Sequence, residues 1–306
     1  MIISASRRTD IPAYYFEWFL NRIKEGFVLV RNPMNDHQIS RISLSAGVVD
    51  GIVFWTKNPV PMLGKLEALE PYPYYIQFTL NAYGTDMEPF VPSKRKVLVP
   101  AFQELSRLLG KDRIVWRYDP ILLNKTYTIS YHCRYFKTLA KILSPFTNTC
   151  IISFFDHYQG INQDIRAPFP DEIPKLAGPM SAVAAAYGLS LKTCAEPFDL
   201  KEFGISHAHC IDLDRLERIS GWRLDCRKDP NQRPECGCYS SIDIGAYNTC
   251  RAACQYCYAN HNPSHIPRLN NMDSGFSPLL CSRVTTGDII RERPVKSCRD
   301  FQTSLF

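Results

Sequence analysis

The chain has 306 residues, of which 45% are hydrophobic, so it can form one large barrel-type domain or two smaller domains with ordinary apolar cores. Its formal net charge of +6 is mild, and it permits an anionic substrate or a nucleic acid without requiring either. The opening residues lack the pattern of a secretory signal, and no apolar stretch is long enough to cross a bilayer. We therefore expect a cytoplasmic protein with no membrane partner, in which metal or redox chemistry explains any cluster among the 12 cysteines better than a disulfide framework does.

Short apolar runs rich in β-forming residues recur along the chain, and most are followed by a segment with helical periodicity. The predicted strands are 2–5, 52–55, 75–79, 113–117, 151–155, 189–192 and 241–244. The predicted helices are 14–24, 97–109, 129–143 and 170–187. Alternating strands and helices are typical of βα units around a mainly parallel sheet. We therefore predict an α/β fold, a (β/α) TIM-type barrel that is either complete or partial.

Polar side chains collect directly after the predicted strands. Arg8 and Asp10 follow the first strand, and Lys57 follows the second. Arg117 ends the fourth strand, and Glu196 follows the sixth. The carboxyl ends of the strands build the active site of a (β/α) barrel, so the series predicts one site at that end of the sheet. For any single residue, the simpler interpretation is that chains turn polar where strands end.

Two parts of the chain depart from the alternating pattern. Residues 201–236 contain one short predicted helix at 213–219, and we interpret them as an insertion or connecting subregion within a barrel of residues 1–260. Residues 261–306 are rich in Pro, Ser and Arg, and we expect a C-terminal tail packed on that barrel. The clearest basic run, 93–96, is expected to be a solvated loop.

The segment 248–260 follows the last predicted strand and contains three cysteines at C-x3-C-x2-C spacing, Cys250, Cys254 and Cys257. Three nearby thiolates can hold three irons of a 4Fe–4S cluster and leave the fourth iron open to a ligand. A bacterial ferredoxin motif needs C-x2-C-x2-C and a further cysteine before a proline, and no such run is present. Structural zinc favours paired C-x2-C with four protein ligands, so a zinc site that recruits a distant fourth cysteine stays an alternative.

With Tyr256 directly before its last thiol, this segment resembles the radical S-adenosylmethionine superfamily, whose signature is C-x3-C-x-aromatic-C in the loop after a barrel strand. Cys250, Cys254, Tyr256 and Cys257 match that signature in full. The continuation 257–259, Cys-Tyr-Ala, is similar to the spore photoproduct lyase-like branch, which repairs DNA. The chain as a whole resembles an uncharacterised microbial domain family with a C-terminal cysteine cluster of this kind.

The position of the motif differs from the superfamily pattern. There the cysteines follow the first strand, whereas here they follow the last one. A circular permutation would reconcile the two, with 241–244 as the family's first strand and 2–5 as its second. Strands that are neighbours in a barrel stay neighbours when the cut point moves. The resemblance therefore implies a permuted barrel with a C-terminal loop that binds the cluster.

The resemblance also implies an enzyme with two cofactors, a 4Fe–4S cluster and S-adenosylmethionine, and an electron donor such as flavodoxin or ferredoxin. S-adenosylmethionine would chelate the open iron through its amino and carboxylate groups. Reductive cleavage would yield a 5′-deoxyadenosyl radical that abstracts hydrogen from a substrate in the barrel. The substrate and the reaction class stay undetermined, and DNA is a candidate only by analogy with the lyase-like branch.

Six residues are candidates for binding S-adenosylmethionine under this resemblance. By the geometry of the superfamily, Tyr256 would lie near the adenine. Arg8, Lys57 and Arg117 are candidates for the cofactor carboxylate, because a fixed cation suits an anionic head group. Asp10 or Glu196 could take the amino group or the ribose. For each charged residue the alternative is a surface ion pair.

Four further cysteines form a candidate second metal site. Cys236 and Cys238 flank one glycine, and with Cys194 and Cys210 they supply four thiols, enough for a second cluster or a zinc ion. A strand rises ~3.3 Å per residue, so Cys236 and Cys250 should lie at opposite ends of strand 241–244. A thiol at position 194, at the carboxyl ends of the strands, would then not easily reach position 238 at the opposite end of the sheet. Of the remaining cysteines, Cys133 and Cys150 are expected to be core residues, and Cys281 and Cys298 are expected to be isolated tail residues.

Two rival functions remain open at this stage. The first is a metal-stabilised binding module, for nucleic acid or another partner, in which zinc or an iron–sulfur cluster only folds the chain. The second is a non-radical iron–sulfur protein that uses its cluster for electron transfer or as a Lewis acid.

Overall fold

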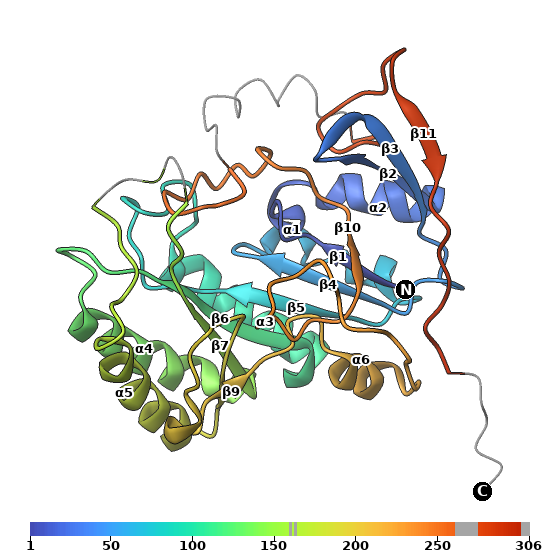
Figure 1. The fold of residues 1–306 in the computed structure, drawn as a ribbon. Coiled ribbons are helices and arrows are strands. Elements are labelled where there is room, and N and C mark those ends of the chain that lie inside the picture. Colours follow the sequence, from blue (N-terminus) through green and yellow to red (C-terminus); the bar gives the residue numbers. More distant parts are fainter. Residues whose placement is uncertain (159–160, 162–163, 261–274, 301–306) are drawn as a thin grey trace, which may run out of the picture.

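The computed structural model describes residues 1–158, 161, 164–260 and 275–300. Its main element is an eight-stranded sheet in which every neighbouring pair of strands is parallel (Figure 1). In pairing order the strands are β10 (Ser241–Asp243), β1 (Ile2–Ala5), β4 (Gly51–Thr56), β5 (Tyr74–Thr79), β6 (Ile114–Ile121), β7 (Thr149–Phe154), β8 (Ser190–Thr193) and β9 (Ser206–His207). The predicted α/β fold with a large parallel sheet is confirmed. A closed TIM-type barrel is not, because within the described residues the pairing order ends at β10 and β9.

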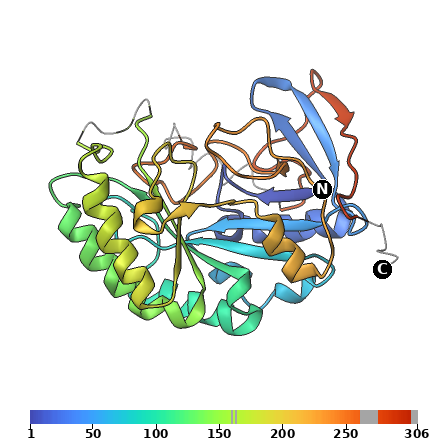
Figure 2. The same cartoon turned by 60° about the horizontal axis from the view of Figure 1, so that its bottom comes forward.

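Six α-helices lie within the described residues. They are α1 (Ile11–Tyr14), α2 (Phe16–Glu25), α3 (Val99–Leu109), α4 (Ile129–Leu143), α5 (Ile173–Ala186) and α6 (Leu213–Ser220). Short 3₁₀ turns occur at Val60–Met62, Leu66–Leu69, Lys111–Arg113, Ser144–Phe146 and Lys201–Phe203, and a π turn at Lys94–Leu98. Helices α4 and α5 pack side by side and cover the outer face of the sheet (Figure 2). No helix in this part of the chain has the length and apolar character needed to cross a membrane.

Both faces of the sheet are covered, which explains why its strands are nearly continuous apolar runs. Alternate side chains of a strand point to opposite faces. Ile3 and Phe54 belong to the larger core, which also contains the buried residues of α2 to α5. Ile2 and Val53 belong to a second core on the other face, together with α6 and the chain around residues 208–238. The segment predicted as a connecting subregion therefore lies on the inner face of the sheet.

A second, smaller sheet was not predicted from the sequence. It contains β2 (Phe27–Asn32), β3 (Asn35–Ser43) and β11 (Ile289–Glu292), in the order β11-β3-β2, with an antiparallel β2–β3 pair and a parallel β3–β11 pair. It stands beside α2 at the upper right of Figure 1. The C-terminal segment is anchored there, since the indole of Trp18 donates to the carbonyl of Ser277 at 2.7 Å.

Contrary to expectation, neither tail cysteine is isolated, and Cys281 is buried in the larger core. Cys298 is not isolated, because it forms a disulfide with Cys226, with 5.5 Å between the two Cα atoms. The two residues are 72 positions apart, so only the folded chain brings them together. The bond joins the C-terminal segment to the inner-face segment that follows α6.

The buried His132 on α4 should make stability depend on pH. Its Nε2 donates to the carbonyl of Leu122 at 2.8 Å and its Nδ1 accepts from the hydroxyl of Tyr118 at 2.9 Å, so the ring is neutral. Burial lowers the pKa of His132 to about 4, against about 6.5 for an unfolded histidine. The unfolded chain binds the extra proton first, so the free energy of unfolding should fall by up to about 3 kcal/mol as pH drops from 6.5 to 4.

Urea denaturation across this pH range measures that change. His132→Gln can keep both hydrogen bonds but does not titrate, so its stability should fall less over the same window. An equal pH dependence in the two proteins would show that another group is responsible.

Candidate active site with two groups of cysteines

A cavity of about 440 Å³ lies at the carboxyl ends of the parallel strands. Its walls come from the residues that directly follow β1, β4, β7, β8 and β10, and from the end of β6. The structure brings all the sequence-predicted site residues to this one cavity. These are Arg8, Asp10, Lys57, Arg117, Glu196 and Tyr256, then Cys250, Cys254 and Cys257, then Cys194, Cys210, Cys236 and Cys238.

The loop after β10 presents its three thiols to this cavity. The loop is closed at its base, where the backbone N–H of Asn248 donates to the carbonyl of Ala259 at 2.8 Å. The side-chain amide of Asn260 donates to the carbonyl of Cys250 at 3.0 Å. Asn248 and Ala253 have φ of 59° and 49°, so the loop makes two left-handed turns that bring its ends together. The loop therefore has a defined local structure.

The three thiols of this loop fit the donor set of a cluster. Burial raises the pKa of Cys250 to about 12 and also raises the pKa of Cys254 and Cys257. Binding of iron must displace these protons, because thiolate is the ligand form. Cluster cysteines bind different irons, so they need not surround one point. As the side chains stand, no group of three or more His, Cys, Asp or Glu among the described residues surrounds a single point.

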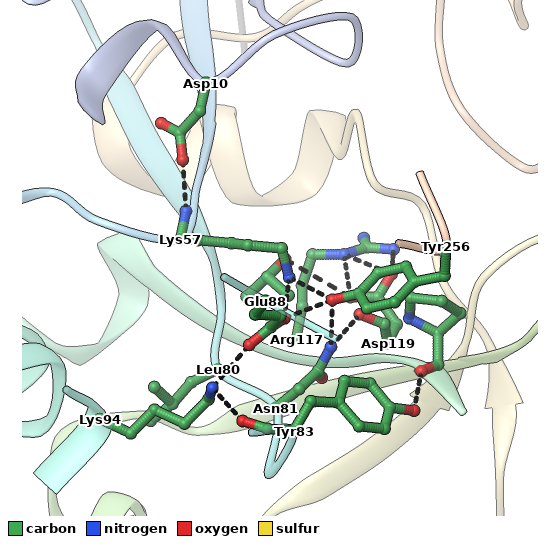
Figure 3. Close-up of polar contacts among 12 residues, drawn as sticks. Asp10, Lys57, Leu80, Asn81, Tyr83, Glu88, Lys94, Arg117, Asp119 and Tyr256 are labelled. Atoms are coloured by element: carbon green, nitrogen blue, oxygen red, sulfur yellow. Dashed lines mark hydrogen bonds and ion pairs between the residues drawn. The ribbon is translucent and has the colours of Figure 1, made fainter. Parts of the chain in front are cut away.

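Tyr256 joins the cysteine loop to a buried ionic network (Figure 3). Its hydroxyl donates to Glu88 and accepts from the Nζ of Lys57 at 2.9 Å. Asn81 also donates to this hydroxyl, at 3.3 Å. Glu88 in turn pairs with Lys57 at 2.9 Å and with Lys94 at 2.6 Å. Burial alone would raise the pKa of Glu88, but the two lysines lower it below its usual value, so the carboxylate stays ionised.

The three basic residues predicted to bind the cofactor carboxylate differ in the length of their ion pairs. Lys57 is paired with Glu88, and Arg117 pairs with Asp119 at 2.5 Å. Arg8 has only a long contact, with 4.0 Å between its Nε and an oxygen of Asp243. Its guanidinium lies over the ring of Tyr247, 5.1 Å from the centroid. Arg8 thus has the weakest ion pair of the three basic residues.

The two acidic residues predicted to contact the cofactor, Asp10 and Glu196, accept hydrogen bonds from backbone N–H groups. Asp10 caps α1 by accepting from the N–H of Ala13 at 2.9 Å, and its other oxygen accepts from the N–H of Lys57 at 2.7 Å. Burial raises its pKa to about 6. Glu196 accepts from the N–H of Phe154 at 2.8 Å. Burial, together with nearby Asp156, raises the pKa of Glu196 to about 8, so at neutral pH it carries a proton that it can donate.

The four remaining cavity cysteines meet, contrary to the geometric argument made from the sequence. The sulfurs of Cys194 and Cys210 are 3.0 Å apart, and the thiol of Cys238 hydrogen-bonds with Cys210 and Cys236. The argument failed for two reasons. Strand β10 has only three residues and spans about 10 Å. The chain before it also runs over the inner face of the sheet, so its thiols reach the cavity from inside.

Several residues of the site were not predicted. Glu88, the centre of the ionic network, lies in the loop between β5 and α3, where no local pattern distinguishes it. Lys94 belongs to the basic run that was expected to be solvated, but it reaches Glu88. Arg7 lies in the cavity wall, and its guanidinium carbon lies 5.4 Å from the centroid of the Trp55 ring. Arg7 is among the polar residues that follow the first predicted strand, so that pattern detects it without giving it a role, but the pattern does not detect Glu88.

Comparisons with known proteins give a family but no reaction. No curated protein matches the chain. One similar solved structure, from Bacteroides thetaiotaomicron VPI-5482, is described as a "putative alpha-L-fucosidase"; it is 12% identical, covers 72% of this chain and 82% of its own, and has a TM-score of 0.29, too low to support an argument. The model of the domain of unknown function DUF1848 matches residues 2–259, from β1 to the end of the cysteine loop. The chain therefore belongs to the DUF1848 family.

Proposed function

We propose that the protein is a radical S-adenosylmethionine-type enzyme in which Cys250, Cys254 and Cys257 hold a 4Fe–4S cluster. The observation that carries the proposal is the placement of these thiols. They follow β10 and line a cavity at the carboxyl ends of a parallel sheet. The cluster and S-adenosylmethionine, when bound, would supply reductive cleavage of the cofactor and a hydrogen-abstracting radical.

The pairing of the first and last strands supports the permuted arrangement. Strand β10 lies at the edge of the sheet beside β1, in parallel register with Ser241 opposite Ile2. The order β10-β1-β4 is what a circularly permuted barrel requires, with the cysteines after the family's first strand. The sequence separation of the two strands is therefore no obstacle to the site.

The residues of the cavity have distinct roles in this proposal. Arg8 is the best candidate for the cofactor carboxylate, because its ion pair within the described residues is long. Burial raises the pKa of Glu196 to about 8, which favours the protonated carboxyl group that can donate a hydrogen bond to a hydroxyl or carbonyl of the bound molecule. Lys57 and Glu88 hold Tyr256 and are positioning residues, since their charges already satisfy one another. The three loop thiols are partly buried where they line the cavity.

Anaerobic reconstitution with iron and sulfide tests the proposal. We expect about four irons per chain, a broad visible absorption band, and release of 5′-deoxyadenosine when the reduced protein is given S-adenosylmethionine. Protein that binds no iron at these thiols, or that assembles a cluster but leaves S-adenosylmethionine intact, would overturn it. The second result would instead support an electron-transfer role.

A further inference from the structure

The cavity contains a second group of thiols that the proposed function does not use. Cys194 follows β8, Cys210 follows β9, and Cys236 and Cys238 precede β10. All four are free cysteines. Their thiols form one continuous chain of contacts, from Cys194 through Cys210 and Cys238 to Cys236. Three separate segments therefore converge on one point.

Specific contacts hold this convergence in place. The carbonyl of Cys210 accepts from the hydroxyl of Tyr75 at 2.5 Å and from the side-chain amide of Gln77 at 3.0 Å. The N–H of Ile211 points to the sulfur of Cys238 at 3.4 Å. Gly237 fits against His209 so closely that an added Cβ would lie 2.5 Å from the ring nitrogen. The thiols are thus positioned by the inner face of β5 and by a turn at Gly237 that packs closely against His209.

Two buried cations adjoin the four sulfurs. The guanidinium of Arg117 donates to the sulfur of Cys210 at 2.9 Å. Arg7 faces Cys210, Cys236 and Cys238, and its buried Nη2 makes no hydrogen bond to any described residue. Buried polar groups are normally satisfied, so the unpartnered Nη2 of Arg7 beside these three thiols is consistent with an anionic group at this point. Four thiolates around one divalent ion carry a net charge of −2, which both arginines favour, although Arg117 also pairs with Asp119 and Arg7 interacts with Asp243.

We propose that Cys194, Cys210, Cys236 and Cys238 bind a single divalent, thiolate-preferring metal ion such as zinc, in a tetrahedral site separate from the proposed cluster. Zinc–sulfur bonds of about 2.3 Å place tetrahedral sulfurs about 3.8 Å apart. The closest pair, at 3.0 Å, needs to open by only about 0.8 Å. The side chains must therefore shift on binding, since the described residues show no group already arranged around an ion. Thiolates of a 4Fe–4S cluster bind different irons and would have to move much farther apart.

The ion would join the two open edges of the sheet. Cys194 and Cys210 follow β8 and β9 at one edge, and Cys236 and Cys238 precede β10 at the other. Hydrogen bonds between strands do not connect these edges in the described residues. A four-thiolate ion would therefore close the ring of strands and form one wall of the cavity, so that its binding stabilises the folded state.

Cobalt titration of the full-length, metal-free, reduced protein tests the site. We expect about one Co²⁺ per chain, with the sulfur-to-metal charge-transfer and visible bands of a tetrahedral thiolate site, and displacement of Co²⁺ by Zn²⁺. Cys238→Ser and Cys194→Ser should each weaken Co²⁺ binding by more than about 100-fold. Cys133→Ser, which alters a cysteine on α4 outside the cavity, should bind as the wild type does.

The variant Cys254→Ala separates this proposal from the proposed function, because it should keep the cobalt bands. Bands that vanish in Cys254→Ala but persist in Cys238→Ser would place the ion at the loop and overturn the second site. An iron–sulfur spectrum that survives in Cys254→Ala would overturn the single-ion assignment. If Cys238→Ser does not fold, the site is tested by the effect of Zn²⁺ on the stability of the wild-type protein. Its urea midpoint must rise with Zn²⁺, and an unchanged midpoint refutes the site.

Discussion

Cys254→Ala is expected to reduce 5′-deoxyadenosine release to the level of a cluster-free blank. Removing one of three thiolates leaves two irons without a protein ligand, where a stable cluster with one open iron needs three donors. The fold should survive, because Cys254 is a small, partly buried side chain whose truncation costs about 1 kcal/mol or less. The measurement is 5′-deoxyadenosine by chromatography after anaerobic reduction, with iron and sulfide determined on the same samples.

Cys133→Ala is the matched control for this experiment. It removes a thiol of similar exposure from α4, away from the cavity, so iron content and cofactor cleavage should be unchanged. A Cys254→Ala protein that still releases 5′-deoxyadenosine at the wild-type rate would exclude the loop as the catalytic cluster site.

Glu88→Ala should lower the free energy of unfolding by about 3–5 kcal/mol, the cost of removing one partner of a buried ion pair. The Glu88 side chain is only 1% exposed, and it is the shared partner of Lys57 and Lys94. Both ammonium groups, exposed by 18% and 23%, would lose their carboxylate, and Tyr256 would lose its acceptor. Urea denaturation measures the change. Because Tyr256 belongs to the cysteine loop, we also expect slower cluster assembly in this variant.

The control for this prediction is Glu104→Ala. Glu104 pairs with Arg107 on the surface of α3, and both side chains are at least half exposed. Such a pair contributes about 0–1 kcal/mol, so the variant should be nearly as stable as the wild type. If Glu88→Ala and Glu104→Ala cost the same, the ionic network is not a significant source of stability.

Local patterns predicted most strands of the main sheet and its helices, but they did not predict the smaller sheet. The helix at α4 begins and ends at the predicted residues, because Thr128 caps it and its apolar face is continuous. The hairpin β2–β3 was missed, since much of β3 is exposed and lacks an apolar run. Strand β11 was missed for the same reason, because all four of its residues are exposed. Pattern reasoning detects buried elements and overlooks exposed ones.

By itself the sequence determined the βα order, the polar residues at strand ends and the three-thiol motif, because each depends on neighbours within a few residues. Only the tertiary structure decided which distant groups meet. Lys57 and Glu88 are 31 positions apart, and Cys210 meets Cys238 only because the chain from 208 onwards covers the inner face of the sheet. That path is set by burial of apolar side chains on both faces, a collective effect that no local spacing records.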